Sequence, residues 1–171
     1  MGIFNFLRKE NNISYYEDAE KLIEAASTIA LINKTTFTKK FPQLHNAANI
    51  KDWELYFTIV ATYCAVMAVK KDVPVKFQDK IYEIVWNKLD SFHKIAQFAY
   101  RDFVNFIETD LSSFSETLTD PASGALHIQK IAGIWLIWNL TDKQPISDEN
   151  IIAHSLSDII FFEFLNYWKT K

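Results

Sequence analysis

Two pairs of side chains in this sequence have the spacing of helical metal ligands. Asp90 and His93 are three positions apart, and His154 and Asp158 are four apart. Either spacing places both members of a pair on one face of a helix, where an imidazole and a carboxylate can share a metal ion. Two such pairs from different helices could meet and support a carboxylate/His metal-dependent enzyme. The inward-facing glutamates of di-iron helical bundles are missing, so this is the third of our three hypotheses.

Other catalytic patterns are absent or weak. The chain has only three glycines and lacks a glycine-rich phosphate loop, a serine nucleophile elbow and a His-Glu-x-x-His zinc motif. One cysteine and four scattered histidines do not make a structural zinc site. Glu163, in an apolar run, and Glu54, beside Trp53, are the best-placed carboxylates for acid–base work, but helical periodicity favours a solvent-facing Glu163. We therefore expect no catalytic residue and no cofactor.

The stretch after Arg101 is acidic. No lysine or arginine occurs between Arg101 and Lys130, and this interval contains five carboxylates: Asp102, Glu108, Asp110, Glu116 and Asp120. Such a surface repels phosphates and attracts basic proteins. The net charge of −3 also argues against specific nucleic-acid binding. We expect a protein partner on this surface, and a basic partner fits it best.

Aromatic residues are abundant, with 14 Phe, 7 Tyr and 5 Trp among 171 residues. Large rings usually fill cores, but they also line ligand pockets. The second hypothesis is therefore a helical bundle that binds a small molecule or a lipid in an aromatic pocket. Its expected lining comes from three helices: Phe57, Tyr63, Trp86, Trp135 and Trp138.

The elements that must position these residues are predicted to be helical. Scarce glycine disfavours hairpins, and no alternating apolar pattern indicates a strand. The four prolines separate stretches with helical periodicity: Pro42, Pro74, Pro121 and Pro145. Residues 75–119 fit either one bent helix or two helices, and we favour a break near Asp90. The expected helices, with a polar connection at 35–49, are 15–33, 53–70, 75–90, 91–118, 121–140 and 147–168.

The helix over 53–70 is expected to be central and buried. Leu55 to Val69 contains no charged residue, yet as a helix it spans only about 22 Å, against a hydrocarbon core of about 30 Å. Cys64 lies within it and is expected to act as a small buried hydrophobe. The sequence thus predicts an all-α, single-domain bundle of five or six helices over residues 1–171.

The leading functional hypothesis is a non-enzymatic, intracellular protein-interaction module with an antitoxin-like, immunity-like or regulatory role. No signal-peptide layout begins the chain, so a cytoplasmic location is expected. Residues 1–13 are expected to form an N-terminal arm that could be mobile. Its apolar residues, followed by Arg8 and Lys9, could make a weak membrane contact, although no transmembrane segment is predicted. A homodimer is compatible with all three hypotheses.

Overall fold

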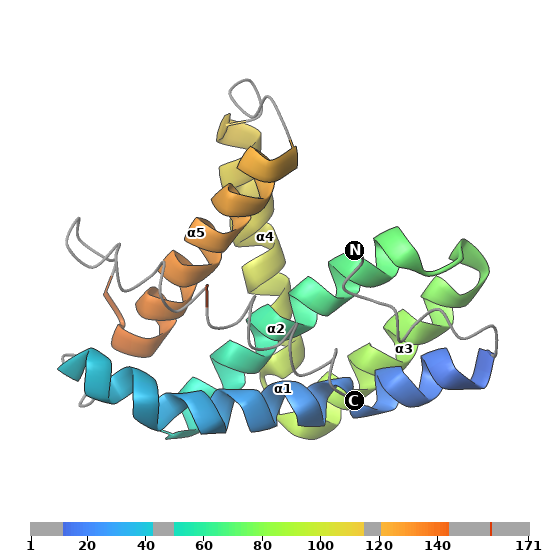
Figure 1. Ribbon diagram of the computed structural model, residues 1–171, viewed down its shortest axis with the longest axis horizontal. Coiled ribbons are helices and arrows are strands. Elements are labelled where there is room, and N and C mark those ends of the chain that lie inside the picture. The colour runs from blue at the N-terminus through green and yellow to red at the C-terminus, as the bar shows by residue number, and fades with distance from the viewer. Residues whose placement is uncertain (1–11, 43–49, 115–120, 144–157, 159–171) are drawn as a thin grey trace.

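Figure 1 shows a computed structural model of the chain, which describes residues 12–42, 50–114, 121–143 and residue 158. This part of the chain contains five α-helices and no strand: α1 (Asn12–Lys40), α2 (Ile50–Asp72), α3 (Val75–Phe92), α4 (Ala96–Phe114) and α5 (Pro121–Thr141). The prediction of an all-α bundle is confirmed. The sixth helix expected over 147–168 lies outside the described residues except for Asp158, as does the N-terminal arm up to residue 11.

Helix α2 is the centre of the bundle and packs against the other four helices. Its buried side chains point to more than one side, because Leu55, Phe57 and Ile59 are all less than 3% exposed. At its start, the Trp53 indole donates a hydrogen bond to the carbonyl of Ala30 on α1, with an N···O distance of 2.6 Å. The prediction of a buried central helix over 53–70 is confirmed.

Helix α1 runs beside α2 and α3 and is longer than predicted (Figure 1). We expected a polar connection from residue 35, but α1 continues to Lys40. Phe37 explains the difference: it is 1% exposed, and its ring lies 5.6 Å from that of Trp53 and 4.7 Å from that of Phe41. This one buried ring holds the polar last turns of α1 against α2.

Residues 75–114 form two helices, as we favoured. Helix α3 ends at Phe92, and His93 adopts an extended backbone with φ −157° and ψ 136°. Its N–H still bonds the carbonyl of Leu89, while its own carbonyl accepts the N–H of Ala96 at 2.8 Å. The chain therefore changes direction at His93 without leaving its backbone groups unpaired.

Helices α4 and α5 lie side by side and rise away from the layer that α1 and α3 form (Figure 1). In α5 the run Ile131–Ile137 is largely buried, and Trp135 is 1% exposed. Within the described residues, no helix combines the length and the apolar character needed to cross a bilayer. The mutual position of α2, α4 and α5 creates the site described next.

Candidate functional site

An open pocket of about 330 Å³ lies where α2, α4 and α5 meet. This volume falls at the small end of the range of about 300–1,000 Å³ that is typical of ligand pockets. The lining combines four aromatic rings, one amide and two carboxylates: Tyr56, Asp102, Phe106, Trp135, Trp138, Asn139 and Asp142. We call it the acidic aromatic pocket.

Helical spacing explains how the acidic aromatic pocket forms. Asp102 and Phe106 are four residues apart on α4, so they share one face of that helix. Along α5 and the residue just after it, the lining residues recur at intervals of three and four, from Trp135 to Asp142. The Asn139 side chain also donates a hydrogen bond to the carbonyl of Trp135 at 2.9 Å. Each helix thus presents one face to the pocket.

Trp135 is a buried part of the lining and ties α5 to α4. Its indole N–H donates a hydrogen bond to Oδ2 of Asp102, with an N···O distance of 2.9 Å. Its ring meets Tyr56 edge-on at 5.4 Å and lies 4.7 Å from Phe103. Trp135 therefore orients the Asp102 carboxylate while it closes the space between the three helices.

The rim of the pocket exposes more aromatic surface. Trp138 is 41% exposed, and its ring meets Phe106 edge-on at a centroid distance of 6.1 Å. Phe98 is 74% exposed and lies one helical turn before Asp102, on the same face of α4. Large exposed rings beside a pocket are typical of binding surfaces.

Asp142 follows the last residue of α5 and has a left-handed backbone, with φ 56°. Its N–H donates to the carbonyl of Trp138 at 2.8 Å, which caps the end of the helix. Asp tolerates this conformation better than most other residues that carry a Cβ. The turn brings a second carboxylate to the same pocket as Asp102.

The charges of this pocket favour a cation. Both ion pairs found in the described part of the chain lie elsewhere, on α1 and α3, so in that part no lysine or arginine pairs with Asp102 or Asp142. Burial, and then the carboxylates of Asp52 and Asp102, raise the pKa of Tyr56. The phenol therefore stays neutral and adds no negative charge. Aromatic faces and carboxylates together attract ammonium and guanidinium groups.

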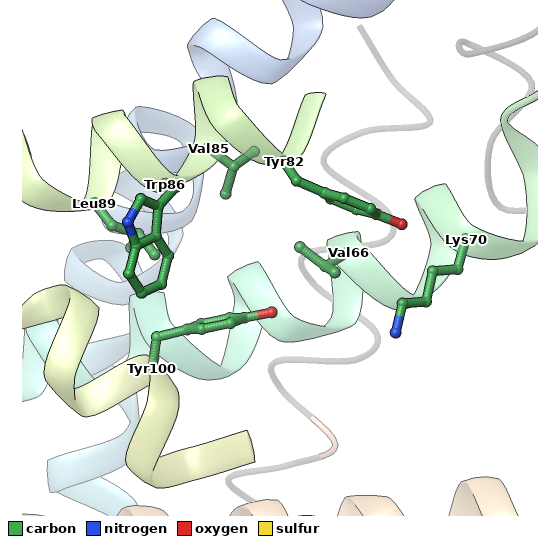
Figure 2. A pocket seen from close by; sticks show the side chains of 7 residues that line it. All are labelled: Val66, Lys70, Tyr82, Val85, Trp86, Leu89 and Tyr100. Atoms are coloured by element: carbon green, nitrogen blue, oxygen red, sulfur yellow. The ribbon is translucent and has the colours of Figure 1, made fainter. Parts of the chain in front are cut away.

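The five residues of the predicted ligand pocket are not gathered around one cavity. Trp135 and Trp138 line the acidic aromatic pocket, whereas Trp86 lines a second pocket between α2, α3 and α4 (Figure 2). Phe57 lies in the core, stacked on Trp53 at 5.7 Å, and Tyr63 meets Phe103 edge-on at 5.2 Å. The two tryptophans of α5 thus line one pocket, but the other residues of that pocket differ from those expected.

The predicted acidic partner surface is described only in part. Asp102 lines the pocket, whereas Glu108 is exposed elsewhere on α4. Glu108 is six positions after Asp102, so the two side chains point about 120° apart around the helix axis. The side chain of Asp110 lies outside the described residues, as do Glu116 and Asp120.

Four residues that line the pocket were not predicted from the sequence: Tyr56, Phe106, Asn139 and Asp142. One signal was present in the sequence: Phe106 follows Asp102 by four residues, a spacing that places both side chains on one face of a helix.

The proposed metal ligands are partly visible. Asp90 is exposed near the end of α3, and Nδ1 of His93 accepts a long hydrogen bond from the Ile95 N–H at 3.4 Å. Asp158 is exposed, and His154 lies outside the described residues. Among the residues that the structure describes, no group of three or more His, Cys, Asp or Glu side chains is close enough to hold a metal ion.

The remaining candidate groups are placed as follows. The Glu54 carboxylate accepts a hydrogen bond from the Ser27 hydroxyl, and Glu163 lies outside the described residues. Burial raises the pKa of the Cys64 thiol to about 12. That thiol therefore stays protonated near neutral pH and is a poor nucleophile.

Comparison with known proteins finds no protein family, no curated protein and no solved structure that this chain matches. The function must therefore be inferred from the chemistry of the pockets themselves.

Proposed function

We propose that this protein is a non-catalytic interaction module that binds a basic segment of a partner protein. The observation that carries this proposal is the acidic aromatic pocket, in which four rings surround a space that also receives the carboxylates of Asp102 and Asp142. A lysine or arginine has the complementary chemistry, with an apolar stem for the rings and a cationic end for the carboxylates.

The surroundings of the pocket suit a protein partner better than a small free amine. Trp138 and Phe98 extend the apolar surface beyond the pocket, where neighbouring side chains of a partner segment could pack on them. Tryptophan and tyrosine are enriched among the residues that dominate binding energy at protein interfaces. One cation–π contact contributes only about 0.5–2 kcal/mol, so a longer basic and apolar segment is needed for useful affinity.

Photo-crosslinking can identify the partner segment. A photoreactive phenylalanine analogue is placed at Trp138, and a control protein carries it at Glu24, an exposed position on α1. After irradiation in cells, mass spectrometry identifies the crosslinked peptides. We expect segments rich in lysine or arginine at position 138 only. Recovery of segments without basic residues at position 138 would contradict the proposal.

A matched pair of variants then tests the role of the pocket carboxylate. Asp102→Asn keeps an oxygen that can accept the Trp135 hydrogen bond, and Glu108→Gln removes the same charge from the same helix outside the pocket. Fluorescence anisotropy with the crosslinked segment as a synthetic peptide should show about tenfold weaker binding for Asp102→Asn and less than about twofold for Glu108→Gln. Equal effects would mean that long-range charge, and not the pocket, recognises the segment.

A further inference from the structure

We propose that a second pocket, between α2, α3 and α4, binds a small amphipathic carboxylate, with an apolar body and one anionic end. The pocket has a volume of about 340 Å³ and shares no residue with the acidic aromatic pocket. Seven residues line it: Val66, Lys70, Tyr82, Val85, Trp86, Leu89 and Tyr100. We call it the α3 pocket, because α3 supplies four of these residues.

The walls of the α3 pocket are fixed by hydrogen bonds between its helices. The Gln78 side chain at the start of α3 donates to the carbonyl of Val73 at 2.7 Å, just after α2 ends. The Gln97 side chain on α4 donates to the carbonyl of Trp86 on α3 at 3.0 Å. The first bond ties α3 to the end of α2, and the second joins α4 to α3, so both fix helices that line the pocket. A site with such fixed walls lowers the entropic cost of binding.

One end of the α3 pocket is apolar. Val85 and Leu89 are 4% and 1% exposed, so they form a buried base. The Trp86 ring stands beside them and meets the Tyr100 ring edge-on at a centroid distance of 6.4 Å. The Arg101 guanidinium lies 4.8 Å from the centre of the Trp86 ring, but Arg101 is not among the residues that line the pocket. An aliphatic chain or a small ring system fits against these surfaces.

The other end carries groups that recognise an anion. Figure 2 shows the hydroxyl groups of Tyr82 and Tyr100 directed away from Trp86 and Leu89, toward the side of the pocket where the Lys70 amine lies. Burial is the main cause that raises the pKa of both tyrosines, so their hydroxyls remain protonated. The Tyr82 hydroxyl donates to Oε1 of Gln78 at 3.3 Å, so the Tyr100 hydroxyl is the donor that we assign to the ligand. None of the seven lining residues is acidic.

The size and chemistry of the α3 pocket define the ligand class. Its volume is near the lower limit of about 300 Å³ for ligand sites, which suits a medium-length acyl chain or a single aromatic system. A carboxylate at the polar end can accept hydrogen bonds from Lys70 and the Tyr100 hydroxyl. The α3 pocket is lined by a lysine and no acidic residue, whereas the acidic aromatic pocket is lined by two carboxylates, so the two proposed ligands have opposite charges.

Isothermal titration calorimetry with decanoate tests this proposal, and decanol serves as a neutral probe of the same length. Lys70→Met keeps the apolar stem but removes the charge, and Lys80→Met is the matched control, because Lys80 is exposed on α3 outside the pocket. We expect decanoate to bind the unmodified protein, with about tenfold weaker binding to Lys70→Met and an unchanged affinity for Lys80→Met. Decanol should bind both variants equally.

A second variant establishes where the probe binds. Val66→Trp fills the pocket from the α2 side, so it should abolish binding of decanoate and decanol alike, while circular dichroism and the melting temperature report whether the fold is kept. Absence of decanoate binding to the unmodified protein would overturn the proposal. Equal affinities for decanoate and decanol would also overturn it, and so would equal losses in Lys70→Met and Lys80→Met.

Discussion

The hydrogen bond between Trp135 and Asp102 is the interaction that most directly joins the stability of the fold to the proposed site. Its donor is buried at 1% exposure, its acceptor is a carboxylate on an exposed residue, and the two are 2.9 Å apart. A hydrogen bond to a charged group is worth about 1.5–3 kcal/mol. Because water can replace the indole at the exposed Asp102, we expect a coupling below this range, about 1 kcal/mol.

A double-mutant cycle measures this coupling. Trp135→Phe removes the donor and keeps an aromatic ring, Asp102→Ala removes the acceptor, and the double variant completes the cycle. The single change at Trp135 should lower the free energy of unfolding by about 2 kcal/mol, of which about half is the lost bond and half the smaller ring. Urea unfolding followed by circular dichroism gives all four free energies.

The coupling energy decides whether this bond contributes to stability. Changes at residues that do not interact usually add to within about 0.5 kcal/mol. If the two single effects add within that limit, the Asp102 carboxylate does not hold Trp135, and the claim that Trp135 orients the pocket carboxylate is refuted. A change at Glu108, which lies outside the pocket on the same helix, should add to Trp135→Phe without coupling.

Two further predictions concern the core. Phe37→Ala should lower the free energy of unfolding by about 3–5 kcal/mol. It should also release the last turns of α1, which hydrogen exchange would detect as lost amide protection after residue 33. Retained protection would show that Phe37 does not hold these turns. Burial raises the pKa of Cys64 from 9.0 to about 12, so between about pH 9 and pH 12 the unfolded chain loses a thiol proton that the folded chain keeps, and stability falls as pH rises. Urea unfolding at pH 7 and pH 10.5 should show this loss in the natural chain and a smaller loss in Cys64→Ala, and equal losses would contradict it.

Helix α4 connects the two pockets. Tyr100 lines the α3 pocket, whereas Asp102 and Phe106 line the acidic aromatic pocket. The helix is tied to α3 through Gln97 and to α5 through Asp102. Different faces of one helix thus line both proposed sites, one proposed for an anion and one for a cation.

The existence and type of the elements could be read from the sequence because they depend on local patterns. The uncharged run from Leu55 to Val69 indicated a buried central helix, and that helix contacts all four of its described neighbours. The apolar spacing over residues 75–119 fitted one bent helix or two, with a break favoured near Asp90, and the backbone breaks at His93. Helical periodicity and charge distribution need no knowledge of distant contacts, so they are visible in the chain itself.

The end of α1 and the composition of the sites were decided by tertiary contacts. Thr35 to Lys40 is polar enough to resemble a connection, but the burial of Phe37 against Trp53, sixteen residues away, keeps it helical. Asp102 and Trp135 are 33 residues apart, and only the packing of α4 on α5 brings them within hydrogen-bond distance. The register and orientation in which helices pack depend on complementary side-chain surfaces. For that reason the sequence by itself grouped Trp86, Trp135 and Trp138 in one predicted pocket, while the fold divides them between two pockets.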